Sequence, residues 1–358
     1  MSEINIHDIR AIHPTDRTLR TGAALARAGL CSDARAADRV AENYAVAVTP
    51  HLAGLIDPGD PDDPIARQFI PNPRELETAE DEIPDPIGDD AHSPVPGIVH
   101  RYPDRVLLLP SLVCPVYCRF CFRREKIGKK GGREDGGILS PERLDAALRY
   151  IADHPTIREV ILSGGDPLGM SDRRLADILD RIDEIDHVDT IRIHSRVPVA
   201  DPARITPSLI AILTRAKPVW LSVHCNHARE ISPETESALA ALSRAGIPLL
   251  SQTVLLRGIN DNVESMAALL RELIRCRVRP YYLHHADMAP GTSHFRTSIA
   301  EGKALMRALR GRIPGFAIPV YVLDIPGGFG KAPLGPDELD GETGKVTDWR
   351  GRTHDYGR

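Results

Sequence analysis

From residue 105 onward, short apolar runs alternate with longer segments whose apolar residues recur at helical spacing. The apolar runs are rich in β-branched residues, which predicts buried strands at 105–109, 159–163, 190–194, 220–224, 249–256, 280–284 and 319–323. The segments between them predict amphipathic helices at 141–152, 172–182, 207–216, 233–245, 262–276 and 298–309. Such strand–helix repeats predict an α/β protein whose parallel sheet is covered by helices.

Polar residues gather at the carboxyl ends of the predicted strands. They are Asp166, His194, His224, Gln252, His284, Asp287 and Asp324. Barrel enzymes place their chemistry at this end of the strands, so the pattern favours a complete or partial barrel with an active site at its carboxyl edge. Periodicity alone leaves an open, doubly wound sheet as the alternative.

Upstream of the predicted sheet the pattern changes twice. Apolar residues at helical spacing within 16–56 predict two or three helices, and a Pro- and Asp-rich stretch over 57–97 predicts a linker that wraps over another domain. We therefore expect N-terminal helices and a wrapping linker over 1–98, a barrel core over 99–331 and a short tail over 332–358.

Composition narrows the class of protein. The 358 residues are 42% hydrophobic and 27% charged, which is close to the average for globular proteins. A net charge of −5 argues against a nucleic-acid partner bound through a general basic surface. The chain shows neither a signal peptide at its start nor an apolar stretch of about 20 residues. We therefore expect a cytoplasmic protein with no membrane partner.

Three of the six cysteines, Cys114, Cys118 and Cys121, lie within eight residues just after the first predicted strand. A reducing cytoplasm disfavours disulfides, so the triplet indicates a metal or redox role. Four thiolates saturate a [4Fe–4S] cluster, and three leave one iron open. In the C-x3-C-x2-C spacing, that open iron is typical of radical S-adenosylmethionine (SAM) enzymes. Zinc is the main rival, but a structural zinc site needs four protein ligands and the sequence has no second cysteine pair.

Two glycine-containing turns also follow predicted strands. At residues 163–166 (Ser-Gly-Gly-Asp), glycine lets the backbone approach a ligand, and the acid can accept hydrogen bonds from an ammonium group. Lys331 follows a second turn and could be a solvated lysine, a phosphate binder or the lysine that carries pyridoxal phosphate (PLP). Arg101, Tyr102 and Arg105 could bind a phosphate, although singly such residues are more often surface residues.

Together these motifs resemble the lysine 2,3-aminomutase family from about residue 50 to about residue 335. The matching stretches are 93–97, 100–105, the cysteine triplet with 122–124, 163–166, 255–258, 260–261, 279–282, 294–297 and 326–331. The resemblance implies a partial (β/α)6-type radical SAM barrel with an N-terminal helical region. It also implies an isomerase, an intramolecular aminotransferase that uses a [4Fe–4S] cluster, SAM and PLP to convert L-lysine into β-lysine.

The resemblance implies roles for individual residues at the matched positions. The residues implied to hold PLP are Lys331, through a covalent bond, and Arg101, Tyr102 and Arg105, through the phosphate. Those implied to lie against SAM are Gly164, Gly165, Asp166, His224 and Gln252. Those implied to bind the amino-acid substrate are Arg123, at its α-carboxylate, and Asp287 and Asp324, at its distal ammonium group.

The sequence departs from the long members of this family after Lys331. Those members carry clustered cysteines that bind structural zinc between subunits, whereas only 27 residues follow Lys331 here and none is cysteine. We therefore expect no structural zinc and no tetramer built on it, which leaves a homodimer open. An external electron donor such as flavodoxin or ferredoxin is implied.

Three alternative functions remain at this point. The enzyme could supply β-lysine for modification of elongation factor P, or act on another amino acid such as glutamate. The third alternative is an electron-transfer module that holds a cluster but no PLP.

Overall fold

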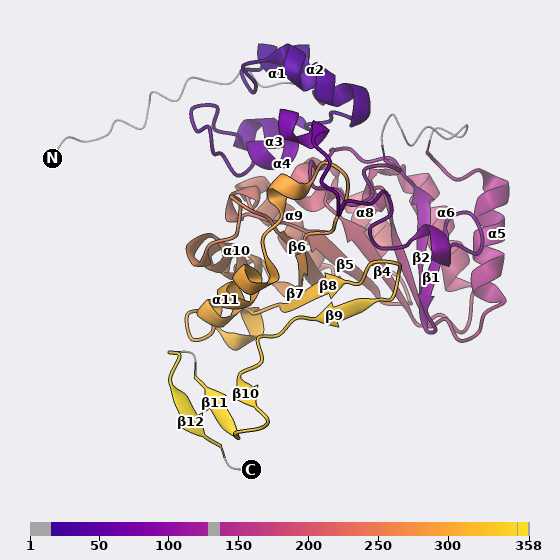
Figure 1. The fold of residues 1–358 in the computed structure, drawn as a ribbon. Helices are drawn as coiled ribbons and strands as arrows, with labels where there is room; N and C mark the ends of the chain where they lie inside the picture. The colour runs from indigo at the N-terminus through magenta and orange to yellow at the C-terminus, as the bar shows by residue number, and fades with distance from the viewer. Residues whose placement is uncertain (1–15, 128–136, 349, 357–358) are drawn as a thin grey trace.

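A nine-stranded sheet forms the centre of the computed structural model, which describes residues 16–127, 137–348 and 350–356 (Figure 1). Its strands follow one another in sequence order from β1 to β9. The central strands, all parallel, are β2 (Arg105–Ser111), β3 (Glu159–Gly164), β4 (Thr190–Ser195), β5 (Val219–His224), β6 (Leu249–Leu255), β7 (Val278–His285) and β8 (Val320–Asp324). Because β1 and β9 end the sheet without pairing with each other, the barrel is partial.

A helix follows each of the first six parallel strands. These helices are α5 (Pro141–Ala152), α6 (Asp172–Asp183), α8 (Pro207–Leu213), α9 (Pro233–Arg244), α10 (Val263–Arg275) and α11 (Ile299–Leu309). Each begins after a side-chain N-cap, which accepts a hydrogen bond from a backbone N–H of the first turn: Ser140, Ser171, Thr206, Ser232, Asn262 and Ser298. The predicted partial (β/α)6-type barrel is therefore confirmed, with β8 added after the sixth unit.

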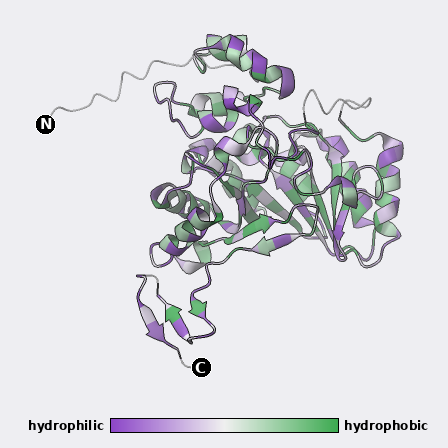
Figure 2. Ribbon diagram, viewed as in Figure 1, coloured by the Kyte–Doolittle hydropathy of each residue, from purple (hydrophilic) through white to green (hydrophobic). Residues whose placement is uncertain are grey.

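The strands present different residues to their two faces. In β4, Ile191 and Ile193 are buried in the main apolar core, whereas Arg192 and His194 line a cavity on the inner side of the sheet. Figure 2 shows apolar residues on the strands and on the helix faces turned toward them. The apolar strand character expected from the sequence thus holds for the helix-covered face, while the inner face is largely polar.

Two edge strands were not expected from the sequence. β1 (Ile98–Tyr102) pairs antiparallel with β2, and β9 (Lys331–Pro333) pairs antiparallel with β8. Lys331, predicted to follow a glycine-rich turn, begins β9 directly opposite Asp324. The glycine-rich turn before it reverses the chain, with Gly327 at φ 85° and Gly328 at φ 84°, values that glycine adopts readily.

The N-terminal segment lies over the carboxyl ends of the strands (Figure 1). Its elements are α1 (Gly22–Arg27), α2 (Ala34–Asn43), α3 (Pro50–Leu55), α4 (Ala66–Phe69), η1 (Pro73–Leu76) and η2 (Asp90–His92). Backbone hydrogen bonds join it to the barrel: Tyr117 N–H donates to the Ala47 carbonyl at 2.9 Å, and Ile83 N–H to the Met288 carbonyl at 2.8 Å. The segment therefore covers the edge at which the sequence places the chemistry.

The tail forms a separate three-stranded sheet of β10 (Leu339–Asp340), β11 (Lys345–Thr347) and β12 (Thr353–Asp355). Figure 1 shows this sheet standing apart from the barrel. Within the described ranges, none of the helices has the length and apolar character needed to span a bilayer.

Candidate active site

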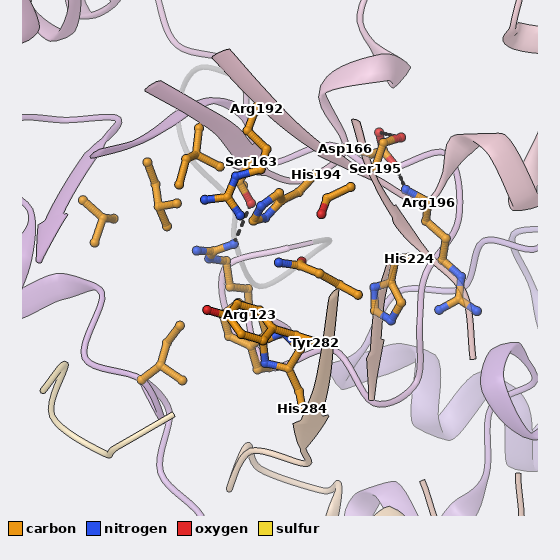
Figure 3. A pocket seen from close by; sticks show the side chains of 18 of the residues that line it. Arg123, Ser163, Asp166, Arg192, His194, Ser195, Arg196, His224, Tyr282 and His284 are labelled. Carbon is orange, nitrogen blue, oxygen red and sulfur yellow. Dashed lines mark hydrogen bonds between the residues drawn. The ribbon is translucent and has the colours of Figure 1, made fainter. Parts of the chain in front are cut away.

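The inner face of the sheet encloses a cavity of about 670 Å³ (Figure 3). Every residue that the sequence assigns to a cluster, to SAM, to PLP or to a substrate lines this one cavity. The residues come from segments as far apart as Arg101 and Lys331. A cavity of this volume is large enough for small-molecule ligands and cofactors.

The three cysteines lie in the loop that follows β2, at one end of the cavity. Burial raises the pKa of each thiol, that of Cys121 to about 11, so iron binding must displace their protons. In the described part of the chain, no three Cys, His, Asp or Glu side chains converge closely enough to hold a single metal ion. A cluster distributes its thiolates over separate irons, so this donor set fits a cluster better than a mononuclear site.

Four charged or titratable groups meet where β7 and β8 end. Lys331 Nζ donates to Asp324 Oδ1 at 2.5 Å, and His284 Nδ1 lies 3.3 Å from Asp324 Oδ2. Burial alone would favour protonated Asp324, but the His284 hydrogen bond and the Lys331 charge hold its pKa below the usual value. Burial, and next the charge of Asp324, raise the pKa of Asp287 to about 8. Lys331 therefore neutralises Asp324, whereas Asp287 is largely protonated at neutral pH.

Asp89, which the sequence did not indicate, joins two of the expected ligand-binding arginines. One carboxylate oxygen of Asp89 accepts a hydrogen bond from Arg101 Nη2, and the other accepts from Arg123 Nε at 2.7 Å. Arg123 Nη1 also donates to Ser163 Oγ at 3.2 Å, as Figure 3 shows. Because Asp89 belongs to the wrapping segment, that segment orients side chains inside the cavity.

Four residues that line the cavity each carry a buried polar atom with no hydrogen-bond partner among the described residues. These atoms are Arg101 Nε, His194 Nε2, Ser222 Oγ and His224 Nε2. Buried polar groups are normally hydrogen-bonded, so atoms of this kind facing a cavity indicate a polar ligand. The donor set at the Lys331 end, with Arg101, Arg105 and a Tyr102 hydroxyl that accepts from Lys331 N–H at 3.0 Å, fits PLP and its phosphate.

Comparison with known proteins decides the family. Residues 108–270 match the model of the Radical SAM superfamily. The L-lysine 2,3-aminomutase of Clostridium subterminale is 46% identical over 292 residues, which cover 82% of this chain and 69% of that protein. The chain belongs to the lysine 2,3-aminomutase family.

Two further relatives, one named for lysine and one for glutamate, match the chain at lower identity. The L-lysine 2,3-aminomutase of Escherichia coli is 38% identical over 297 residues, covering 81% of this chain and 83% of that protein. The glutamate 2,3-aminomutase of Clostridioides difficile is 39% identical over 300 residues, covering 84% of this chain and 70% of that protein. The chain is thus a radical SAM aminomutase, which is an isomerase, and its radical SAM domain implies a [4Fe–4S] cluster and SAM.

In this lysine 2,3-aminomutase family member, Asp166 makes different contacts from those expected. Its carboxylate accepts hydrogen bonds from Ser195 Oγ at 2.7 Å and from the backbone N–H groups of Leu168, Arg196 and Val197 at 3.1, 2.7 and 3.2 Å. A carboxylate offers about four lone-pair positions, and four donors occupy them. Asp166 therefore joins the turn after β3 to the end of β4, and its role in SAM binding stays a prediction.

The glycines of the same turn also have a structural role. A Cβ atom on Gly164 would lie 2.5 Å from the Ser111 carbonyl oxygen, and one on Gly165 would lie 2.3 Å from the Val113 carbonyl oxygen. Only glycine lets this turn approach the backbone that leads into Cys114. The turn therefore fixes the beginning of the cysteine loop.

The expected SAM neighbours His224, at the end of β5, and Gln252, in the middle of β6, lie side by side in register. The Phe120 ring, from the cysteine loop, has its centroid 5.6 Å from that of His224. Burial, and next the charge of Arg196, hold the pKa of His224 far below its usual value, so the ring is neutral. A neutral imidazole can accept or donate a hydrogen bond without adding a charge beside the cluster.

A buried ion cluster that the sequence did not indicate holds the cysteine loop under the N-terminal segment. Glu75 Oε2 accepts hydrogen bonds from Arg119 Nη2 at 2.6 Å and from Arg124 Nη2 at 2.5 Å, and these side chains are fully buried. Arg119 Nη1 also donates to the Ala45 carbonyl at 2.6 Å. These contacts join η1, the segment that follows α2 and the cysteine loop.

Replacing Glu75 by alanine is expected to lower the free energy of unfolding by about 3–5 kcal/mol, because two buried guanidinium groups would lose their carboxylate. Denaturant unfolding of the purified protein measures the change. Glu77→Ala, an exposed site two residues away, is the control and should change stability by less than about 0.5 kcal/mol. Equal stability of the two variants would contradict a structural role for Glu75.

Proposed function

We propose that the protein is a PLP-dependent lysine 2,3-aminomutase that converts L-lysine into β-lysine. The observation that carries this proposal is the charge distribution in the cavity. Arg123 provides a cation suited to an α-carboxylate, and Asp287 and Asp324 provide two buried acids suited to a distal ammonium group. Glutamate would bring a second carboxylate to those acids, so the charges favour a diamino acid.

The ion pair of Lys331 strengthens this choice. Its ammonium group pairs with Asp324, and the pKa of Asp287 is raised. When Lys331 is engaged by PLP it no longer supplies this charge. The two acids then require another buried cation, and the distal ammonium group of lysine supplies one.

The roles of the chain's own residues follow from these contacts. The cluster and SAM together supply a carbon radical that removes a hydrogen atom from the substrate, and PLP supplies the π system through which an amino group can move. Arg123, oriented by Asp89 and Ser163, would fix one end of the substrate, while Asp287 and Asp324 would fix the other. Holding both ends restricts the reacting carbon to one position and keeps water out.

The reductant belongs to the proposal as well. A small one-electron donor protein such as flavodoxin or ferredoxin would deliver the electron that starts each radical reaction. In the purified system a chemical reductant can replace it.

Anaerobic reconstitution with iron, sulfide, PLP, SAM and a chemical reductant tests the proposal directly. Incubation with lysine is expected to give β-lysine, and chiral chromatography of the products assigns its handedness. Turnover of glutamate but not lysine would refute the substrate assignment and leave the cofactors intact. A cluster without bound PLP would instead favour the electron-transfer alternative.

The affinity for lysine is expected to increase as pH rises toward about 8 and then to level off. With a pKa of about 8, Asp287 is protonated at lower pH and must release that proton to pair with an ammonium group. Binding below pH 8 should therefore strengthen by up to about tenfold per pH unit. Binding titrations at several pH values measure the slope.

The control ligand is 2-aminohexanoate, which has the carbon chain of lysine without the distal amine. Its affinity should lack this additional slope, because it brings no cation to the two acids. Asp287→Asn should remove the additional slope for lysine and weaken lysine binding about tenfold or more. Equal pH slopes for the two ligands would contradict the proposed contact.

A further inference from the structure

Arg196, at the end of β4, makes a contact with the cluster loop that the reaction described above does not use. Its Nη1 lies 3.5 Å from the sulfur of Cys118, in hydrogen-bonding geometry. We propose that this contact sets the reduction potential of the [4Fe–4S] cluster and makes the cluster easier to reduce. The inference depends on the cluster alone and is independent of lysine and PLP.

The structure holds the guanidinium group of Arg196 rigidly in this position. Its Nη2 donates to Gln68 Oε1 and to Glu230 Oε2, both at 2.6 Å, and the arginine side chain is 4% exposed. The guanidinium carbon lies 4.6 Å from the ring centroid of Phe69 and 5.4 Å from that of Phe120. With Nη2 fixed by two acceptors, Nη1 is directed at the sulfur.

The partners of Arg196 are themselves fixed from several elements. Glu230 Oε1 accepts from the backbone N–H groups of Asn226 and His227, each at 2.8 Å, and Gln68 Nε2 donates to Glu230 Oε1 at 3.2 Å. The backbone of Gln68 also accepts from Arg119 N–H at 2.9 Å, within the cysteine loop. The wrapping segment, the loop after β5 and the cysteine loop therefore position one guanidinium group together.

The sign of the effect follows from electrostatics. Reduction adds one negative charge to the cluster and its thiolates, and an N–H donor on a thiolate stabilises the more negative state. The site is buried, so little solvent screens the interaction. The ion pair with Glu230 reduces the net charge, but the N–H directed at Cys118 is unaffected by it. Removing Arg196 should therefore lower the reduction potential.

Anaerobic redox titration of the reconstituted holoenzyme, followed by electron paramagnetic resonance, tests the sign and size of the expected change in reduction potential. For Arg196→Gln, the ratio of reduced to oxidised cluster at a fixed applied potential should fall about tenfold, which is about 59 mV for a one-electron couple. Arg204→Gln is the matched control. Arg204 lies on the same connection after β4 and donates to the Leu168 and Met170 carbonyls without contacting a sulfur. The reduction potential of the cluster in Arg204→Gln should match that of the wild type.

Two outcomes of this titration would overturn the proposal. One is an unchanged potential in Arg196→Gln at full iron and sulfide content. The other is an equal shift in Arg196→Gln and Arg204→Gln, since that would make the effect one of net charge rather than of the sulfur contact.

A second measurement does not depend on the stability of the glutamine variant. In wild-type protein labelled with ¹⁵N in the arginine guanidinium groups, pulsed electron paramagnetic resonance of the reduced cluster should detect a ¹⁵N coupling. The coupling should disappear in Arg196→Lys, whose amine carries no label. Absence of the coupling in the wild type, or a coupling of unchanged strength in Arg196→Lys, would show that Arg196 is not bonded to a cluster thiolate.

Discussion

Cys118→Ala is expected to remove the [4Fe–4S] cluster and all aminomutase activity. Cys118 is the middle of the three proposed ligands, and it packs against the apolar cluster that contains Phe120 of the same loop. With one ligand already left open for SAM, losing a second leaves the cluster two thiolates. Iron and sulfide analysis with the visible absorbance of the reconstituted protein measures the loss.

The matched control is Cys276→Ala. Cys276 is buried at the end of α10, is part of the main apolar core and does not line the cavity. This variant should keep its iron, sulfide and activity and lose only a small amount of stability. A normal cluster in Cys118→Ala, or a missing one in Cys276→Ala, would show that the cysteines have been assigned wrongly.

Lys331→Ala is expected to abolish PLP binding and to lower aminomutase activity by several orders of magnitude, while the cluster stays intact. PLP binding should be lost because the side-chain nitrogen of Lys331 is the atom that can bond to the carbonyl carbon of PLP. The side chain is partly exposed to the cavity, so its removal should leave the fold unchanged. Two measurements test this prediction: the PLP absorption band should be lost, and the iron content should stay unchanged.

An exposed lysine of the tail sheet provides the control for this second prediction. Lys345→Ala removes the same charge at β11 and should retain the PLP band and full activity. If Lys331→Ala keeps both the band and the activity, the PLP-dependent mechanism is refuted. If it keeps the band but loses activity, PLP is held by its phosphate contacts alone.

Local sequence signals were sufficient to predict most strands and helices of the barrel. Each strand–helix unit combines an apolar run, a Ser, Thr or Asn N-cap and an amphipathic helix, and all three signals lie within about 25 to 50 residues. The cysteine triplet is local in the same sense, because its spacing is complete within one loop. The family match then brought distant residues such as Arg101, Asp287 and Lys331 into one hypothesis.

Contacts between distant segments could not be predicted in this way. Asp89 lies in a stretch whose proline and aspartate content indicates only a linker, yet its carboxylate joins Arg101 to Arg123. Gln68 and Arg196 are 128 positions apart, and neither belongs to a recognisable motif. Their roles depend on which backbones cross at the carboxyl edge of the sheet.

The contacts of Asp166 could not be predicted from its motif. The Ser-Gly-Gly-Asp sequence predicted a turn with an acid able to bind an ammonium group, and the structure shows that the carboxylate accepts hydrogen bonds from the end of β4. Residue type and spacing show that an acceptor is present. They do not show whether its lone pairs are already occupied.

The sequence by itself predicted the parallel strands, the helices between them, the cysteines proposed to hold the cluster and the family, because each depends on residue spacing along the chain. The tertiary structure alone decided how charges are shared: Lys331 with Asp324, Glu75 with two arginines, and Arg196 with the sulfur of Cys118. Electrostatic interactions depend on distance in space and on burial, and neither quantity can be calculated from separation in sequence.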